Sequence, residues 1–263
     1  MEYSSELEAT IRHMVQRGRG ILAADESLPT IAKRFAAINV HSTEEQRRIW
    51  RSLLVTTAGL GEYIGGIILF DETLGQKTNG SKAIADAAWE QRIVPGIKVD
   101  KGTIPLALSP GDLITQGLDG LAARLRDYKQ QGARFAKWRE VYALDRHTPT
   151  QHGIEANAEM LARYAAVCQS EGLVPIVEPE VLMDGDHDIQ RHADVTEAVQ
   201  FAVFQALVRH HVTLELMILK PNMVLPGKDC RRATPDEIAE ATLTVLRRTV
   251  PAAVPSINFL SGG

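Results

Sequence analysis

Short apolar runs alternate with longer amphipathic stretches along this chain of 263 residues. Seven runs have the length of a strand and are nearly continuous in Ile, Val, Leu and Phe: residues 20–27, 65–72, 96–101, 135–142, 174–180, 214–222 and 254–263. Strands that are buried on both faces of a parallel sheet have this pattern, because neither face meets water. The runs therefore predict seven buried, parallel strands.

The stretches between the runs have helical periodicity and recognisable ends. The stretch 43–58 has a hydroxyl residue suited to an N-cap at its start, either Ser42 or Thr43. The stretch 117–132 repeats leucine at helical spacing. The segment that begins at Thr234 reads Thr-Pro-Asp-Glu, a capping box with proline at the first helical position.

Strand and helix in regular alternation predict an α/β fold with right-handed crossovers. A length near 250 residues is common for a TIM (β/α)₈ barrel. We expect residues 1–263 to form a single barrel domain that is incomplete at its C-terminal end, because the eighth strand and the helices after it are missing.

Ionisable side chains gather where these strands end. Alternation along a strand places Lys137 on one face with Arg139, and Glu178 on one face with Glu180. The first, third and sixth runs carry their charged groups near the same end. A barrel brings the C-terminal ends of its strands to one rim, and active sites lie there.

The residue types at this rim favour Schiff-base chemistry. We expect Lys137 and Lys220 to face one another across the narrow mouth of the barrel. A neighbouring cation and partial desolvation would both favour a neutral, nucleophilic amine. Glu178 would transfer protons as the carbinolamine forms and dehydrates. The other Lys, Arg and Ser groups, with a Ser-Gly-Gly turn, suit phosphate oxygens. A phosphorylated carbonyl compound is the substrate class that fits.

Composition narrows the alternatives. Lys plus Arg is 29 and Asp plus Glu is 33, which gives a net charge of −4 and no overall attraction to nucleic acid or to an anionic membrane. The acidic start lacks a secretory signal, and no apolar run is long enough to span a membrane. The two cysteines, Cys168 and Cys230, provide neither a disulfide framework nor a thiolate metal site. We expect a cytoplasmic protein.

A metal centre is not expected. The eight histidines are scattered along the chain, and the acidic segment 184–188 lacks the spacing and the later glutamate of a calcium loop. A polar loop after a strand explains that segment better than a cation site. We therefore predict no metal and no other cofactor.

Six motifs in order resemble the class I fructose-bisphosphate aldolases of glycolysis: LAADES, GIKVDKG, FAKWR, PIVEPE, LKPNMV and FLSGG. The similarity extends over nearly the whole chain. It implies a metal-independent, cytoplasmic lyase that assembles as a homotetramer. It also implies reversible cleavage of fructose 1,6-bisphosphate to dihydroxyacetone phosphate and glyceraldehyde 3-phosphate.

The resemblance also assigns roles to individual residues. It makes Lys220 the Schiff-base lysine and Glu178 the acid/base group, with Lys137, Asp25 and Glu180 as further catalytic residues. Substrate and phosphate contacts are expected from seven residues: Ser27, Thr30, Arg34, Lys98, Arg139, Ser261 and Gly262.

Two departures from the family pattern bear on these expectations. Leu28-Pro29-Thr30 stands where many relatives have Thr-Gly-Ser, although Thr30 keeps a hydroxyl group. Relatives also continue past the Ser-Gly-Gly turn into a strand with a phosphate-binding arginine. Two alternatives to the leading function stay open: a Schiff-base aldolase for another phosphorylated sugar, and a non-catalytic phosphosugar-binding or scaffold protein.

Overall fold

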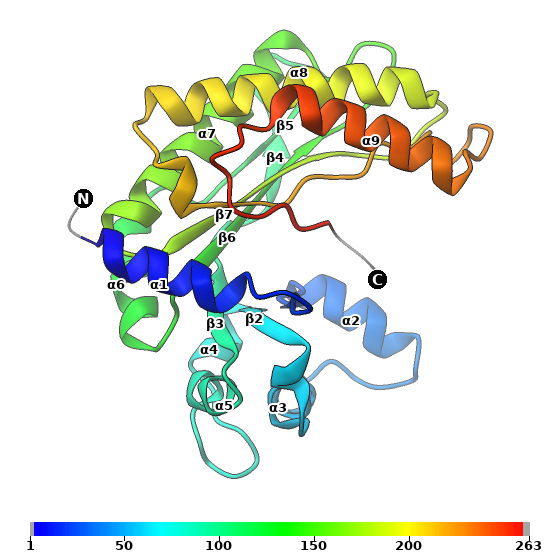
Figure 1. Ribbon diagram of the computed structural model, residues 1–263. Coiled ribbons are helices and arrows are strands. Elements are labelled where there is room, and N and C mark those ends of the chain that lie inside the picture. The colour runs from blue at the N-terminus through cyan, green and yellow to red at the C-terminus, as the bar shows by residue number, and fades with distance from the viewer. Residues whose placement is uncertain (1–2, 260–263) are drawn as a thin grey trace. The chain divides into compact units, whose positions relative to one another are not determined.

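The computed structural model describes residues 3–259 of the chain (Figure 1). These residues form two compact units. Unit 1 comprises the residues up to Val99 together with Ala122–Lys137 and Ser170–Val174. Unit 2 comprises Asp100–Leu121, Trp138–Gln169 and the residues from Pro175 onward. Strand β6 (Phe135–Tyr142) contributes its first residues to unit 1 and the others to unit 2.

Strands and helices alternate in both units. In unit 1 the elements before β6 are α1 (Ser4–Met14), β1 (Gly20–Ala24), α2 (Leu28–Ala36), α3 (Glu44–Thr56), a 3₁₀ turn (Leu60–Glu62), β2 (Ile64–Leu69), α4 (Asp71–Leu74), α5 (Ile84–Glu90), β3 (Val94–Lys98) and nearly all of α6 (Leu121–Gln130). The elements assigned wholly or mainly to unit 2 are β4 (Thr103–Pro105), β5 (Leu113–Thr115), α7 (Gln151–Ser170), β7 (Val174–Val181), α8 (Ile189–Arg209), a 3₁₀ turn (Leu214–Leu216), β8 (Ile218–Leu219) and α9 (Pro235–Thr249).

The strands of unit 1 are parallel, in the order β1-β2-β3-β6. Ile67, Leu69 and Ile97 are fully buried, as the continuous apolar runs predict. Gly96 lies opposite Phe135 in the β3–β6 register, and a Cβ atom at this glycine would lie 2.2 Å from the Phe135 ring. A side chain at position 96 would therefore force these two strands apart.

In unit 2 the strand order continues as β6-β7-β8, and β7 pairs with β8 in parallel. The long helices α8 and α9 lie side by side (Figure 1). Trp138 and Tyr164 are fully buried and pack with their ring centroids 5.5 Å apart. Cys168 is also fully buried, on α7. Parallel strands joined through helices confirm the α/β class.

Helix ends agree closely with the sequence prediction. The Thr43 hydroxyl accepts a hydrogen bond from the Gln46 amide at 3.2 Å, so Thr43 is the N-cap of α3. At the start of α9, the Thr234 hydroxyl and the Glu237 carboxylate each accept the other residue's backbone N–H, which is the predicted capping box.

The predicted runs 20–27 and 65–72 end early, at Ala24 and Leu69, and two other predicted strands differ more in extent. Residues 214–222 were expected to be one strand, but Leu214–Leu216 form a 3₁₀ turn and only Ile218–Leu219 are extended in a ladder. The amide group of Gln169 donates to the carbonyls of Thr213 and Leu216, and this contact stabilises the turn. In the last predicted strand, the described residues show an isolated parallel bridge, between Leu219 and Ile257.

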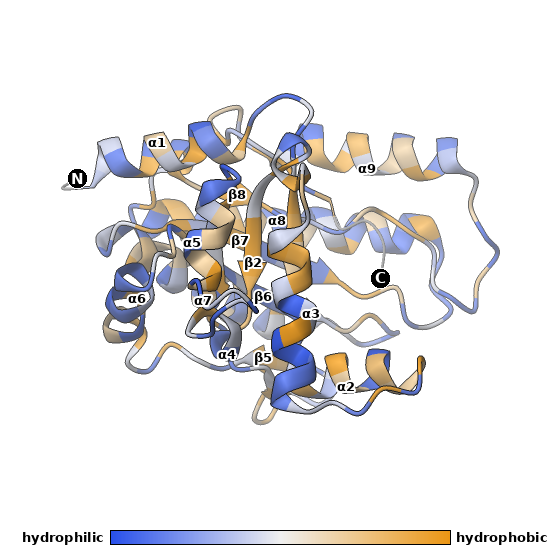
Figure 2. Ribbon diagram, turned by 90° about the horizontal axis from the view of Figure 1, so that it is seen from below, coloured by the Kyte–Doolittle hydropathy of each residue, from blue (hydrophilic) through white to orange (hydrophobic). Residues whose placement is uncertain are grey.

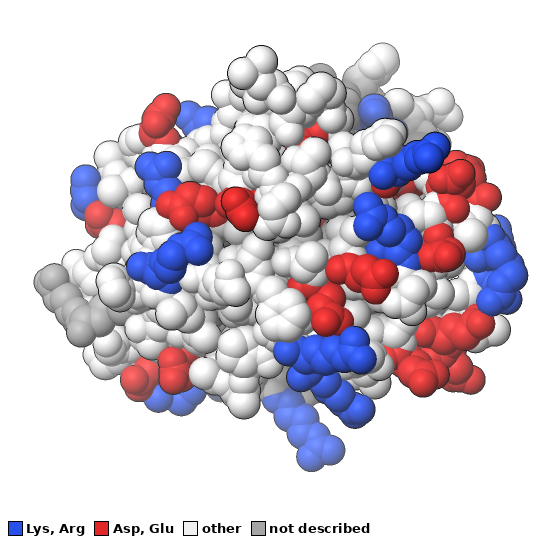
Figure 3. Space-filling model, turned by 90° about the horizontal axis from the view of Figure 1, so that it is seen from above, with Lys and Arg blue, Asp and Glu red and all other residues white. Residues whose placement is uncertain are grey.

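Strands and helices differ in polarity. Strand β2, with the sequence Ile-Gly-Gly-Ile-Ile-Leu, is mostly coloured as hydrophobic, whereas α3 alternates between hydrophilic and hydrophobic bands (Figure 2). Lys and Arg are interspersed with Asp and Glu over the face shown in Figure 3. Within residues 3–259 no helix is both long and apolar enough to cross a bilayer.

Candidate active site

Lys220 follows β8 directly, and its side chain meets Glu178 of β7. The backbone N–H of Lys220 donates to the Val177 carbonyl at 2.9 Å, which extends the β7–β8 pairing by one residue. Its Nζ forms an ion pair with Oε1 of Glu178, and the two side chains are 13% and 5% exposed. An amine beside a buried carboxylate can lose its proton to that carboxylate, which is what a nucleophilic lysine needs.

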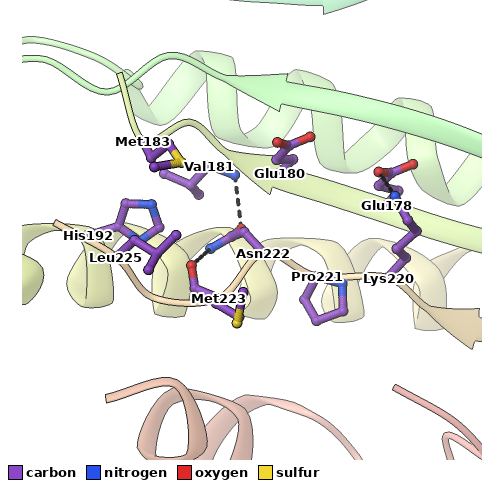
Figure 4. Close-up of a pocket in the computed structure, with 10 residues that line it drawn as sticks. All are labelled: Glu178, Glu180, Val181, Met183, His192, Lys220, Pro221, Asn222, Met223 and Leu225. Atoms are coloured by element: carbon purple, nitrogen blue, oxygen red, sulfur yellow. Dashed lines mark hydrogen bonds and ion pairs between the residues drawn. The ribbon is translucent and has the colours of Figure 1, made fainter. Parts of the chain in front are cut away.

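A pocket of about 170 Å³ extends from this pair. Figure 4 shows Lys220 and Glu178 at one end of the group, with Asn222 in the middle and His192 at the other end. Met183, Met223 and other apolar side chains complete the lining. The pocket therefore combines one ionic end with apolar walls.

Asn222 connects the ends of β7 and β8. Its Oδ1 accepts the Val181 N–H at 3.0 Å, and its Nδ2 donates to the Thr196 hydroxyl at 3.2 Å and to the Met223 carbonyl at 3.1 Å. Sequence reasoning did not select this residue. The polar side chain two positions after Lys220, at the end of a buried strand, was the available signal.

His192 is a buried, neutral histidine in the same pocket. Burial and the neighbouring His187 ring lower its pKa to about 4, although a contact with the Val181 backbone opposes the shift. The two imidazole rings stack with centroids 5.3 Å apart. At neutral pH the imidazole of His192 in the pocket lining is therefore uncharged.

Arg139 of β6 pairs with Glu180 of β7, and its Nε donates to a Glu180 carboxylate oxygen. Burial alone would lower the pKa of Arg139, but the hydrogen bond to Glu180 and the charges of Glu178 and Asp100 outweigh it and raise that pKa. The guanidinium is thus a permanent cation, suited to phosphate oxygens.

Unit 1 holds a second group of predicted residues. Asp25, just beyond β1, forms an ion pair with Lys137 of β6 at 2.8 Å. Lys98, the last residue of β3, lies opposite Lys137 in the parallel register. Asp25 and Lys137 are therefore in direct contact, and Lys98 lies on the strand next to Lys137.

A carboxylate between two arginines supports the end of β1. Glu26 accepts from Arg34 at 2.7 Å and from Arg51 at 2.6 Å. Arg51 is only 2% exposed and also donates to the Ala24 carbonyl, next to Asp25. Burial lowers the Arg51 pKa, and the charges of Glu26 and Asp25 oppose that shift. Sequence analysis missed Glu26 and Arg51, because on a helix Arg51 resembles a solvent-exposed residue.

The remaining predicted substrate-binding residues divide into two cases. Ser27 and Thr30 lie at the start of α2, with their hydroxyl oxygens 2.9 Å apart. Ser261 and Gly262 lie outside the described residues, so their predicted contacts are untested.

The structure brings the predicted residues together in pairs. Unit 2 contains Lys220 with Glu178 and Arg139 with Glu180, while Asp25 and Lys137 belong to unit 1. In the stretch 3–259 no three His, Cys, Asp or Glu residues are grouped so that they could hold a metal ion.

Comparison with known proteins identifies the family. The family model for class-I fructose-bisphosphate aldolase matches residues 6–263. The chain belongs to this family. Members are lyases, and the enzyme class predicted from the sequence is confirmed.

Individual relatives agree along the whole chain. The cytosolic fructose-bisphosphate aldolase 5 of Arabidopsis thaliana is 54% identical over 262 residues, which are 100% of this chain and 73% of that protein. A probable class 1 aldolase of Xanthomonas campestris is also 54% identical, over 98% of this chain and 78% of its own.

A solved structure extends the agreement to three dimensions. The fructose-bisphosphate aldolase of Plasmodium falciparum, solved with TRAP and a small-molecule inhibitor, matches with a TM-score of 0.97 and 48% identity. The match covers 100% of this chain and 76% of that chain. The fold class is therefore α/β, of the TIM-barrel type expected from the sequence.

Proposed function

We propose that this chain catalyses the reversible aldol cleavage of fructose 1,6-bisphosphate through a Schiff base on Lys220. The ion pair between Lys220 and Glu178, at one end of a pocket beyond two parallel strands, carries the proposal. Membership of the aldolase family supports the substrate and the products.

The first half of the reaction forms an iminium ion. Lys220 transfers its proton to Glu178, and the neutral amine attacks the ketone carbon C2 of the sugar bisphosphate. After the attack the nitrogen gives up a second proton, and Glu178 delivers both protons to the carbinolamine oxygen, which leaves as water. The resulting positively charged nitrogen is the electron sink for the next step.

The second half breaks and reforms bonds to carbon. A base removes the proton from the C4 hydroxyl, the C3–C4 bond breaks, and its electron pair passes to the iminium nitrogen to give an enamine. Glyceraldehyde 3-phosphate leaves. Protonation of C3 and hydrolysis of the imine release dihydroxyacetone phosphate and restore Lys220. From the family resemblance we assign Asp25 to the breaking bond, Lys137 to the carbinolamine steps, and Glu180 to assisting Glu178.

Phosphate recognition is assigned to the cationic and hydroxyl groups. Arg139 holds a permanent charge, and Lys98 lies at the end of β3. Ser27 directly precedes α2, Thr30 lies in its first turn and Arg34 in its last turn. Ser261 and Gly262 are proposed to supply a further phosphate contact on the basis of family resemblance alone.

Borohydride trapping tests the assignment. With dihydroxyacetone phosphate, the protein should gain a stable secondary-amine adduct on Lys220, located by peptide mass spectrometry. Lys220→Arg should abolish trapping because a guanidinium forms no imine at a useful rate. An adduct on Lys137 or Lys98 would assign the nucleophile elsewhere, and cleavage of another phosphorylated sugar in preference would change the substrate.

Three wider properties are also proposed. A cytoplasmic location is supported by the word cytosolic in the names of plant relatives. A single domain over residues 1–263 is supported by one family model that matches residues 6–263. A homotetramer is expected from the family resemblance, and light scattering of the purified protein measures it.

A further inference from the structure

A buried acid lies behind Arg139. Residues 138, 140 and 142 share the face of β6 opposite Arg139, and the side chain of Glu140 has no exposed surface at all. The proposed reaction does not use this carboxyl group. A carboxyl group so deeply buried is costly unless hydrogen bonds compensate for the lost water.

Both oxygens of Glu140 accept hydrogen bonds. Oε1 accepts from the indole Nε1–H of Trp138 at 2.7 Å, and Oε2 accepts from the backbone N–H of Thr115 at 3.2 Å. Thr115 is the last residue of β5, so its hydrogen bond to the Glu140 carboxyl group links β5 to the face of β6 opposite Arg139. Two N–H donors on two oxygens suit the ionised form.

Thr115 also contacts Arg139 itself. Its hydroxyl donates to the Arg139 carbonyl at 2.9 Å, while the Arg139 N–H points to a carboxylate oxygen of Asp100 at 3.4 Å. The peptide groups on both sides of Arg139 are therefore held by neighbouring residues, and its guanidinium reaches Glu180 from the opposite face.

We propose that Glu140 is a positioning residue for Arg139. Through Thr115 it fixes the segment of β6 that presents the guanidinium to Glu180 and to the phosphorylated substrate. The inference rests on the proposed function, in which Arg139 binds that substrate.

The protonation state of Glu140 controls its hydrogen bonds to Trp138 and Thr115. Burial raises its pKa to about 8, the bonds from Thr115 and Trp138 oppose the shift, and the charge of Asp100 adds to it. Below that pH one oxygen is a hydroxyl group, which accepts an N–H more weakly than a carboxylate oxygen does, so one of the two bonds is weakened. Above it both bonds are charge-assisted.

Few other groups can produce the same transition. Burial raises the pKa of Tyr142 on β6 and of Tyr164 on α7 well above the usual range for tyrosine. Both tyrosines therefore stay neutral near pH 8. Asp100 faces the same region from the segment after β3, and its negative charge adds to the rise in the Glu140 pKa.

Steady-state kinetics between pH 6.5 and about 9 tests the proposal. The KM of the wild-type protein for fructose 1,6-bisphosphate should fall as pH rises through about 8. Glu140→Gln should remove this step. Above pH 8 its KM should be about fivefold higher than that of the wild type, the factor expected for one lost hydrogen bond, and kcat should change less.

Two further variants separate positioning from stability. Tyr142→Phe changes the same buried face at a hydroxyl with no hydrogen-bond partner, so it should keep the wild-type KM and pH step. Thr115→Val removes the hydroxyl that reaches Arg139, and this hydroxyl also lowers the Glu140 pKa, but the variant keeps the N–H that reaches Glu140. It should raise KM and flatten its pH profile. A retained KM step in Thr115→Val or Glu140→Gln would overturn the proposal.

A second measurement does not depend on catalysis. Trp138 emission should show a transition near pH 8 that moves to higher pH in Thr115→Val and disappears in Glu140→Gln. Amide hydrogen exchange over residues 113–116 should be faster in Glu140→Gln than in Tyr142→Phe. If wild-type protein fails to cleave the sugar, the proposed function fails, while these two readouts still decide the role of Glu140. Unchanged emission and exchange would refute it.

Discussion

Asp25 and Lys137 form a buried ion pair, with 2.8 Å between Lys137 Nζ and Asp25 Oδ2 and side chains only 11% and 7% exposed. Lys137 belongs to β6 and Asp25 directly follows β1, and little of either side chain is exposed to water. Such a pair contributes little net stability compared with apolar residues, but the removal of one partner leaves a buried charge.

Asp25→Ala should therefore lower the free energy of unfolding by roughly 3 kcal/mol, measured by urea denaturation. The matched control is Glu90→Ala, which breaks the exposed 2.5 Å pair between Glu90 and Lys82. That variant should lose less than about 1 kcal/mol. Equal losses in the two variants would show that burial of the Asp25–Lys137 pair has no energetic consequence.

His192 should make the protein sensitive to acid. Its pKa is about 4 when folded and about 6.5 when unfolded, so the unfolded chain binds the proton first as pH falls. Stability should decline between those two values, by up to about 3 kcal/mol from this group. Urea denaturation at several pH values measures the slope, and His192→Gln should make it smaller by about one proton. An unchanged slope would mean that another group titrates there.

The capping box of α9 should contribute measurably to stability. Thr234→Ala removes the acceptor for the Glu237 amide and should cost about 1 kcal/mol in denaturant unfolding. Glu237→Ala should cost a similar amount, because the Thr234 amide then loses its carboxylate partner. Thr234→Ser keeps the hydroxyl and should behave like the wild type. A loss in Thr234→Ser as large as in Thr234→Ala would attribute the effect to the methyl group.

Chelation should leave aldol cleavage unchanged. The protonated imine on Lys220 supplies the electron sink in the proposed reaction, so no Lewis acid is needed at the carbonyl. Activity is measured before and after prolonged incubation with EDTA, with a zinc-dependent enzyme as the positive control. Loss of activity that zinc restores would contradict the Schiff-base mechanism for this chain.

Local pattern was a good guide to the elements and a poor guide to their edges. The run 135–142 became β6 without change, because a strand buried on both faces has an unmistakable apolar signature. The hairpin of β4 and β5 was not predicted, since three-residue strands beside Pro105 leave almost no periodicity. The turn at 214–216 was missed because it depends on Gln169, a residue distant in the chain.

The sequence by itself determined the α/β alternation, the helix caps and the positions of the ionisable groups near the strand ends. These features depend on residues within one or two turns of one another, so periodicity and residue type suffice to reveal them. Tertiary structure alone decided the partners: Lys220 with Glu178, Lys137 with Asp25, and Arg51 with Glu26. Pairing depends on register and burial across strands, because only a desolvated charge needs a particular partner at a particular distance. The same reason hid Glu140, whose neighbours in the sequence give no indication that Thr115 comes to cover it.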